Sequence, residues 1–255
     1  MKIDTLLSPA ELPALAQRDL RGTACVVFDI LRATTTFVTA LQNGAAAVIP
    51  VSEISEAVAF QKSEVRSQKS EFILLAGERD GVKIRAAQSG GVDFDFGNSP
   101  REFTPEAVRG QTIVSTTTNG TRALRACLGA KIILASSFLN LAATARLLNQ
   151  SDAEEILLVC AGTGTGVALE DVLAAGALIE LLSARGDTHV SDSVEIARRT
   201  FLNAQPNLPA ALAGSQNARR LLAIPELRDD VAFCSQRDIF NLVAEMKPDG
   251  IIRRG

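Results

Sequence analysis

The sequence predicts an α/β domain built on a largely parallel β-sheet. Three observations lead to this prediction: short apolar runs that suit buried strands, helical patterns that alternate with them, and polar or glycine-rich residues directly after the apolar runs. The clearest case is ACVVFDILRATTT at residues 24–36, where a strand is followed by Asp29, Arg32 and three threonines. Because open α/β sheets bind ligands at the carboxyl ends of their strands, we interpret this stretch as the centre of an active site.

Size and composition indicate a globular protein without a nucleic-acid or membrane role. At 255 residues and 47% hydrophobic content the chain can form one large domain or two small ones, and we expect a single domain over residues 1–255. The net charge of −3 offers no field for nucleic acid, and without tryptophan or tyrosine there are few stacking platforms. No signal peptide or membrane span is expected, so we predict a cytoplasmic protein. Homo-oligomerisation stays open.

The four cysteines are expected to be reduced and structural. None has CxxC spacing, and three lie within apolar strand or helix patterns. We therefore predict neither a disulfide nor a zinc site. The residues concerned are Cys25, Cys127, Cys160 and Cys234.

Each element has a local signal. Apolar runs predict strands, and capping residues followed by i, i+3, i+4 spacing predict helices. The expected strands are an entry strand within 1–21, then 24–28, 46–51, 72–76, 112–115, 131–135, 155–160 and 231–235. The expected helices are 11–18, 35–42, one after Ser52, one after 118, one after 137, one from about 169, 193–203, 215–222 and 238–244. Residues 82–100 are expected to form a functional or mobile loop, and 248–250 a turn.

Two segments share one order of elements. Residues 22–66 and 110–150 each show a strand, three consecutive threonines, a helix, a Gly-Ala pair and a second strand. We interpret this as a degenerate duplication of a βαβ unit, in which both threonine turns approach one cavity. The alternative is that any two βαβ units share this rhythm, although the triple threonine is not explained by it.

The strand ends indicate an anionic ligand. Threonine-led helix N-termini offer hydroxyls and free backbone N–H groups, which suits a phosphate. GTGTG at 162–166 has neither GxGxxG nor Walker spacing, so it indicates close backbone approach to an anion rather than a nucleotide fold. The alternative for the first turn is purely structural: Asp29 ends a strand and a threonine caps the helix.

Catalysis should rest on oxygen chemistry. The single histidine, His189, makes a histidine metal site or a phosphohistidine enzyme unfavourable, and no cysteine has the arginine that a cysteine phosphatase needs six residues later. Carboxylates that follow successive strands favour Mg²⁺. With Arg32 neutralising charge, such an ion would suit phosphoryl transfer. The acids concerned are Asp29, Glu78, Asp95, Glu170 and Asp171.

Several ordered motifs resemble one known family. VVFDILRATTT, GER with Gly81, FDFGNSP, TTTNGTRAL, VCAGTGTGVALED, SQNARRLL and FCSQRD resemble the 2-phosphosulfolactate phosphatase family over nearly the whole chain. The resemblance implies a three-layer α/β/α fold with a mostly parallel or mixed sheet. It also implies Mg²⁺-dependent hydrolysis of (2R)-O-phospho-3-sulfolactate to 3-sulfolactate and phosphate, a step of coenzyme M biosynthesis. Two departures, the AAQSGG insertion at 86–91 and GVALED at 166–171, bear on the substrate, which could be another phosphorylated hydroxy acid.

From these motifs we assign expected roles. Catalysis is assigned to Asp29, Arg32 and Glu78, and the metal to Asp29, Asp95, Glu170 and Asp171. Substrate binding is assigned to Thr34, Thr35, Thr36, Asn98, Thr117, Thr118, Asn119, Gly120, Thr121, Cys160, Gly162 and Thr163. Glu78 and Asp95 should lie within about 15 Å of Asp29, since charges farther apart than the ~8 Å screening length interact little.

Two other functions compete with this hypothesis. A haloacid-dehalogenase-type phosphatase would also place an aspartate after a buried strand, but Leu31 stands where the second aspartate of its DxD motif belongs. A non-catalytic anion-binding or metabolite-sensing protein could use the same threonine turns without cleaving its ligand. Stabilisation by phosphate without turnover would favour it.

Overall fold

The computed structural model describes residues 2–15, 17–66, 73–182 and 189–255. Within them, 11 strands form one sheet in the order β5-β4-β6-β3-β11-β10-β7-β2-β8-β1-β9. The strands are β1 Lys2–Leu6, β2 Thr23–Phe28, β3 Ala47–Pro50, β4 Ile73–Arg79, β5 Val82–Lys83, β6 Thr112–Thr116, β7 Ile132–Ser136, β8 Glu155–Cys160, β9 His189–Val190, β10 Ala244–Met246 and β11 Ile252–Arg254.

The sheet consists of two parallel groups joined by an antiparallel hairpin. β4, β6 and β3 are parallel neighbours, as are β7, β2, β8, β1 and β9. The C-terminal hairpin of β10 and β11 lies between the groups and pairs antiparallel with β7 on one side and β3 on the other. The turn expected at 248–250 connects these two strands. The sheet is therefore mixed, and the C-terminal hairpin provides the backbone pairing between its two parallel groups.

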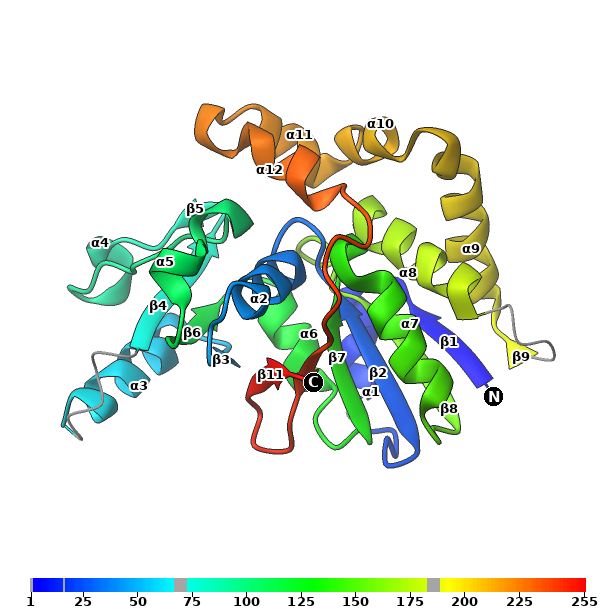
Figure 1. Cartoon of the computed structure of the whole chain (residues 1–255), viewed down its shortest axis with the longest axis horizontal. Coiled ribbons are helices and arrows are strands. Elements are labelled where there is room, and N and C mark those ends of the chain that lie inside the picture. The colour runs from blue at the N-terminus through cyan, green and yellow to red at the C-terminus, as the bar shows by residue number, and fades with distance from the viewer. Residues whose placement is uncertain (1, 16, 67–72, 183–188) are drawn as a thin grey trace.

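Helices cover both faces of the sheet (Figure 1). They are α1 Leu12–Leu15, α2 Ala33–Gln42, α3 Ile54–Arg66, α4 Ala86–Ser89, α5 Pro105–Val108, α6 Gly120–Ala126, α7 Leu141–Gln150, α8 Leu169–Leu182, α9 Asp192–Ala204, α10 Leu208–Ala213, α11 Gln216–Leu222 and α12 Arg228–Cys234.

Strand β2 explains the layering. Its successive side chains point to opposite faces, as in any strand. Val26 and Phe28 pack in the core formed with α7, α8 and α9, whereas Cys25 and Val27 pack in the core formed with α1, α2 and α6. Every residue of β2 is buried, which is why its sequence is continuously apolar rather than alternating. The expected three-layer α/β/α fold is confirmed.

The two similar segments cross the sheet in opposite directions. In the first, β2, α2 and β3 lead from one parallel group to the other, and β6, α6 and β7 lead back. β2 consequently pairs with β7, and β3 pairs with β6. Duplication remains an interpretation, but the turns that follow the two first strands lie close together, since a Cβ added to Gly120 would lie 2.5 Å from Asp29 Oδ2.

Two elements near the C-terminus differ from the sequence prediction. A strand is expected at 231–235, but 231–234 belong to helix α12 and Ser235 follows its end, because Asp230, Val231 and Cys234 share one buried helical face. Residues 238–244, expected as a helix, are irregular up to β10, where Ala244 pairs with Ala135 of β7. The 82–100 stretch contains β5 and α4 besides its loops. Of the strand expected at 72–76, Phe72 lies outside the described residues.

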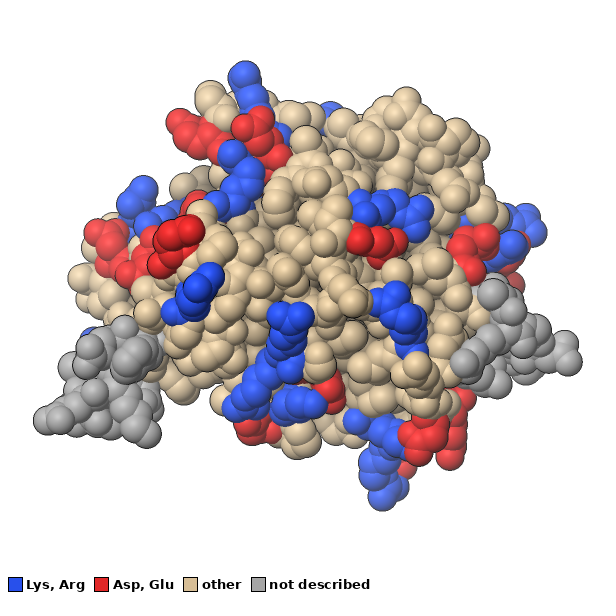
Figure 2. All heavy atoms as spheres, viewed as in Figure 1, with Lys and Arg blue, Asp and Glu red and all other residues tan. Residues whose placement is uncertain are grey.

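The surface carries mixed charge on the face in view. Acidic and basic side chains lie interspersed in small groups there (Figure 2). Among the described helices, none has the length and apolar character to cross a membrane.

Candidate active site

The turn between β2 and α2 contains a buried carboxylate. The Asp29 side chain is 9% exposed, and its Oδ1 accepts a hydrogen bond from the Ala33 N–H at 3.0 Å. The Thr34 hydroxyl donates to the Asp29 carbonyl oxygen at 3.0 Å. Asp29 therefore caps α2 with its own carboxylate. Its other oxygen, Oδ2, has no hydrogen-bond partner among the described residues.

A cavity of about 350 Å³ opens beside Asp29. Its floor comes from the carboxyl ends of β2, β4, β6 and β8, and its roof from α11 and the residues after it. In Figure 1, α10 in gold and α11 and α12 in orange lie above those strand ends. The lining residues are Asp29, Leu31, Arg32, Glu78, Asp80, Gly81, Asn98, Thr118, Asn119, Gly162, Thr163, Gly164, Gln216, Asn217, Arg220, Leu221 and Ile224.

The starts of α2 and α6 meet at this cavity. A Cβ added to Gly120 would lie 2.5 Å from Asp29 Oδ2 and 2.6 Å from Ala33 Cβ. Only glycine allows the second threonine turn to come this close to the first. Gly120 thus contributes through its missing side chain, and its neighbours Thr118 and Asn119 line the cavity.

Asp29 and Asp171 both have a raised pKa, and the charges of neighbouring acids contribute to each. Burial raises the pKa of Asp29 to about 7, and the charges of Glu78 and Glu170 act in the same direction, against the Ala33 N–H and Arg32. Burial and the charges of Glu170 and Asp29 raise the pKa of Asp171 well above its usual range. Such accumulated negative charge favours a bound cation, because a cation would stabilise every carboxylate in its ionised form.

Glu170 and Asp171 lie in the first turn of α8 but differ in whether their carboxylate oxygens are free to bind a ligand. Asp171 uses both oxygens internally, since Oδ1 accepts from the Ile30 N–H at 2.8 Å and Oδ2 from the Gly162 N–H at 2.9 Å. Glu170 accepts from Asn217 Nδ2 at 2.6 Å through Oε1, whereas its Oε2 is buried without a partner in the described structure. Asp171 therefore braces two loops, and Glu170 retains one free oxygen.

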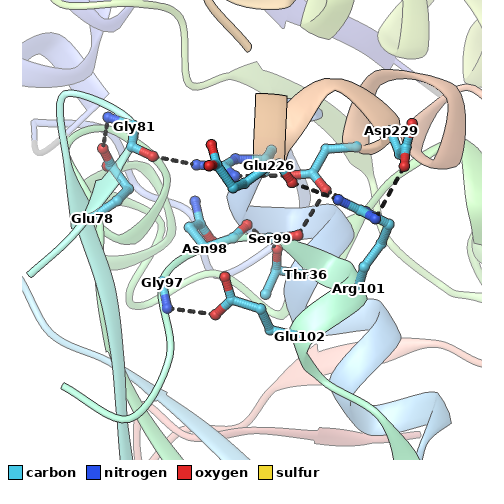
Figure 3. Close-up of polar contacts among 12 residues, drawn as sticks. Thr36, Glu78, Gly81, Gly97, Asn98, Ser99, Arg101, Glu102, Glu226 and Asp229 are labelled. Atoms are coloured by element: carbon cyan, nitrogen blue, oxygen red, sulfur yellow. Dashed lines mark hydrogen bonds and ion pairs between the residues drawn. The ribbon is translucent and has the colours of Figure 1, made fainter. Parts of the chain in front are cut away.

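Glu78 connects the end of β4 to the start of α6. Its Oε1 accepts from the Thr118 N–H at 2.8 Å and from the Thr118 hydroxyl at 3.0 Å. Its Oε2 accepts from the Gly81 N–H at 2.8 Å, as drawn in Figure 3. Glu78 lines the cavity, but these contacts make it a support for the surrounding backbone.

A second buried carboxylate, Asp230 of α12, holds the roof in place. Its Oδ2 pairs with Arg32 Nη1 at 2.7 Å, and its Oδ1 accepts from Ser99 Oγ at 2.7 Å and Arg101 Nε at 2.9 Å. Arg32 also donates to the Gly81 carbonyl at 2.7 Å. Figure 3 shows these contacts between the α12 segment, the 97–102 loop and the turn at Gly81. The expected charge-neutralising Arg32 is itself neutralised by Asp230.

Sequence reasoning assigned no role to Asp230, Asn217 or Arg220. Asp230 could have been found from its place on the apolar face of α12, where an unpaired acid would be costly. Asn217 and Arg220 lie within SQNARRLL, which contributed to the family resemblance but was given no role.

Several expected site residues do not line the cavity. The hydroxyls of Thr35 and Thr36 donate to the carbonyls of Ile30 and Asn98, and Thr117 and Thr121 bond each other at the start of α6. These hydroxyls stabilise the turns, but the side chain that caps α2 is Asp29 and not a threonine, which differs from the structural alternative for the first turn. The expected site residues outside the lining are Thr34, Thr35, Thr36, Asp95, Thr117, Gly120, Thr121, Cys160, Glu170 and Asp171.

Asp95 and Cys160 show two different reasons why an expected site residue lies outside the cavity lining. Asp95 is exposed, and its Oδ2 accepts from the Leu75 N–H at 2.7 Å, so it fixes the 94–97 loop beside β4. Cys160 is fully buried at the end of β8, and burial raises the pKa of its thiol well above the ordinary value. All four cysteines are buried and free.

The donor set permits one kind of metal binding. Among the described residues, no group of three or more acids, cysteines or histidines is arranged to enclose an ion. Mg²⁺ typically needs no such cage, because it keeps several waters and binds one or two carboxylates together with substrate phosphate. Asp29 Oδ2 and the orphaned Glu170 Oε2 are oxygens of this type. Asp29 and Glu170 are the candidates for Mg²⁺, because Glu170 lies close enough for its charge to act on Asp29. Asp171 uses both of its oxygens on backbone amides, and Asp95 is exposed outside the cavity lining.

Comparisons with known proteins agree on one family. A family profile described as 2-phosphosulpholactate phosphatase matches residues 10–249. The chain is 38% identical over 240 residues to a probable 2-phosphosulfolactate phosphatase of Caldanaerobacter subterraneus, covering 94% of both chains. It is 41% identical over 218 residues to one from Thermotoga maritima, covering 86% of both, and 34% identical over 247 residues to one from Clostridium perfringens, covering 97% of this chain and 94% of the relative. The chain belongs to the 2-phosphosulfolactate phosphatase family.

Proposed function

We propose that this protein is a Mg²⁺-dependent phosphatase that hydrolyses 2-phosphosulfolactate, or a closely related phosphorylated hydroxy acid, to 3-sulfolactate and inorganic phosphate. On the first substrate, this is a step of the coenzyme M biosynthesis type. The observation that carries the proposal is the Asp29 carboxylate, which is buried at the end of β2 with one oxygen free beside the cavity. Family membership supports the choice of substrate.

In this proposal Asp29 and Glu170 hold the metal. Bound Mg²⁺ would offset the negative charge of the phosphoryl group and polarise its P–O bonds. Burial raises the pKa of Asp29 to about 7, and a bound cation would lower this pKa and so favour the ionised carboxylate near neutral pH. We assign Asp95 and Asp171 structural roles, because their contacts to backbone amides fix the loops at the sheet edge.

Neutral side chains complete the phosphate end of the cavity. Asn98 is 5% exposed, and its side-chain amide has no partner among the described residues, so it can donate to a phosphoryl oxygen. Asn119 is held in place by donating to the carbonyls of Ala161 at 2.8 Å and Gly164 at 3.0 Å. The roof helix α11 limits access of bulk water, which strengthens electrostatic interactions inside.

Hydrolysis requires one bond to form and one to break. A water oxygen attacks phosphorus, the bond from phosphorus to the ester oxygen breaks, and the leaving oxygen takes a proton to give the hydroxyl of the product. The fixed turn at Asp29 and the Asn98 amide orient the phosphoryl group for this step, and such orientation accounts for much of the acceleration in phosphoryl transfer.

The test is release of inorganic phosphate from 2-phosphosulfolactate by the purified protein with Mg²⁺. We expect turnover that EDTA abolishes and added Mg²⁺ restores, and glycerol 2-phosphate serves as a substrate without acid groups. Failure to hydrolyse any phosphorylated hydroxy acid would contradict the proposal. Thermal stabilisation by phosphate or sulfolactate without turnover would instead support the anion-sensing alternative.

A further inference from the structure

Arg220 is the cation that the cavity leaves unpaired. The lining contains the acids Asp29, Glu78 and Asp80 and the cations Arg32 and Arg220. Arg32 is 3% exposed and paired with Asp230. No ion pair or side-chain hydrogen bond of Arg220 occurs within the described residues, and its side chain is exposed at the cavity.

The helix that carries Arg220 is held firmly over the cavity. Asn217 Nδ2 donates to Thr163 Oγ1 and to Glu170 Oε1, both at 2.6 Å, which ties α11 to the loop after β8 and to α8. On its other side, Ala218 and Leu221 are buried against Val231 of α12. The backbone at Arg220 is therefore fixed, while its guanidinium is free to meet a ligand.

We propose that Arg220 determines substrate specificity by binding the acid group of the substrate that is not transferred. The proposal rests on the phosphatase function above and extends it to a second contact. A phosphorylated hydroxy acid carries a carboxylate or sulfonate besides its phosphate, and that group must enter a cavity whose acids would repel it. A guanidinium presents parallel N–H donors that match such oxygens and, unlike an ammonium, can bind two of them at once.

The neighbouring Arg219 provides a matched control. It lies on the same helix and is also exposed, but it does not line the cavity, and its Nη1 donates to the Gly214 carbonyl. Arg219→Gln and Arg220→Gln therefore remove the same charge from adjacent positions. If the positive charge acted only through the general electrostatic field of the helix, kcat/KM would fall in both variants. Direct contact with the substrate would lower kcat/KM only in Arg220→Gln.

Three substrates identify the group that Arg220 binds. 2-Phosphosulfolactate carries a carboxylate and a sulfonate, 2-phospholactate carries only the carboxylate, and glycerol 2-phosphate carries neither. We expect Arg220→Gln to lower kcat/KM for 2-phosphosulfolactate about 10- to 100-fold, mainly through KM, which is the range for a hydrogen-bonded charge. A similar loss with 2-phospholactate assigns Arg220 to the carboxylate, and a loss confined to the first substrate assigns it to the sulfonate.

An equal loss with glycerol 2-phosphate would overturn the proposal, because Arg220 would then act on the phosphoryl group. A matching loss in Arg219→Gln would also overturn it. Arg220→Lys should recover only part of the loss, since an ammonium lacks the paired donors. If the wild type hydrolyses none of these esters, the proposed function fails. Calorimetric titration of wild type and Arg220→Gln with 3-sulfolactate then tests whether Arg220 binds the acid group. Binding weakened at least about tenfold by Arg220→Gln supports recognition, and unchanged or absent binding contradicts it.

Discussion

Replacing Asp29 with asparagine should abolish activity while making the folded protein more stable. Asparagine keeps an oxygen that can accept the Ala33 N–H, so the turn into α2 is preserved. It removes the charge that the proposed metal site requires, and such losses commonly cost several kcal/mol of transition-state stabilisation. No buried cation is left without its partner, because Arg32 pairs with Asp230 and not with Asp29.

The gain in stability follows from the raised pKa of Asp29. Its value rises from 3.8 to about 7 on folding, so the folded state binds the proton more tightly than the unfolded state. The resulting stabilisation is fully present below about pH 4 and is lost as the pH rises through about 7. At 1.36 kcal/mol per pKa unit, the loss at pH 7 is about 4 kcal/mol without metal. An asparagine side chain cannot ionise, so the Asp29→Asn variant avoids this loss and should melt on the order of 10 °C higher.

Measurements on one preparation of each protein test this reasoning. We expect the difference in unfolding free energy between Asp29→Asn and wild type to grow from about pH 4 to about pH 7 in EDTA, and Mg²⁺ to stabilise only the wild type. Phosphate release by the variant should fall at least about 100-fold. A variant that is less stable at every pH, yet has near-normal specific activity in its folded fraction, would refute the role given to Asp29.

Three further substitutions test the surrounding structure. Asp230→Asn should lower the unfolding free energy by about 3–5 kcal/mol, because it leaves a buried arginine unpaired, and the exposed neighbour Asp229→Asn should change it little in the same urea titration. Equal effects of the two would contradict the importance of the buried pair. Gly120→Ala should lower kcat about 100-fold by displacing the carboxylate beneath it, whereas Gly214→Ala, whose added carbon meets nothing closer than 3.4 Å, should not. Asp95→Asn should release phosphate at a rate within about twofold of wild type, since the asparagine oxygen still accepts from the Leu75 N–H. A loss of activity as large as that expected for a metal ligand would show that Asp95 belongs to the active site.

The sequence predicted those elements whose apolar pattern directly reflects their burial in the folded protein. β2 is apolar throughout because both of its faces are covered, so its end at Asp29 could be located in advance. The bounds of β8 and the start of α8 could also be predicted, because an unbroken apolar run forms β8 and regularly spaced apolar residues begin α8. These elements carry Asp29, Glu170 and Asp171, and therefore the region of the candidate site could be predicted from the sequence.

Contacts between distant segments could not be read from local pattern. The pair of Arg32 and Asp230 joins residues 198 positions apart, and β10 forms because β7 is available to it, not because of its own sequence. The short run at 231–234 suits a strand or a helix, and only the burial of Asp230 on the same face decides for the helix. The threonine runs indicated an anion site, yet most of their hydroxyls stabilise the turns that position Asp29.

The most direct test of the central claim is a crystal structure of the protein soaked with Mn²⁺, as a visible substitute for Mg²⁺, and inorganic phosphate. We expect anomalous density for one ion contacting Asp29 and Glu170, with phosphate beside Asn98 in the cavity under α11. An ion bound instead at Asp95, or phosphate bound away from the cavity, would contradict it.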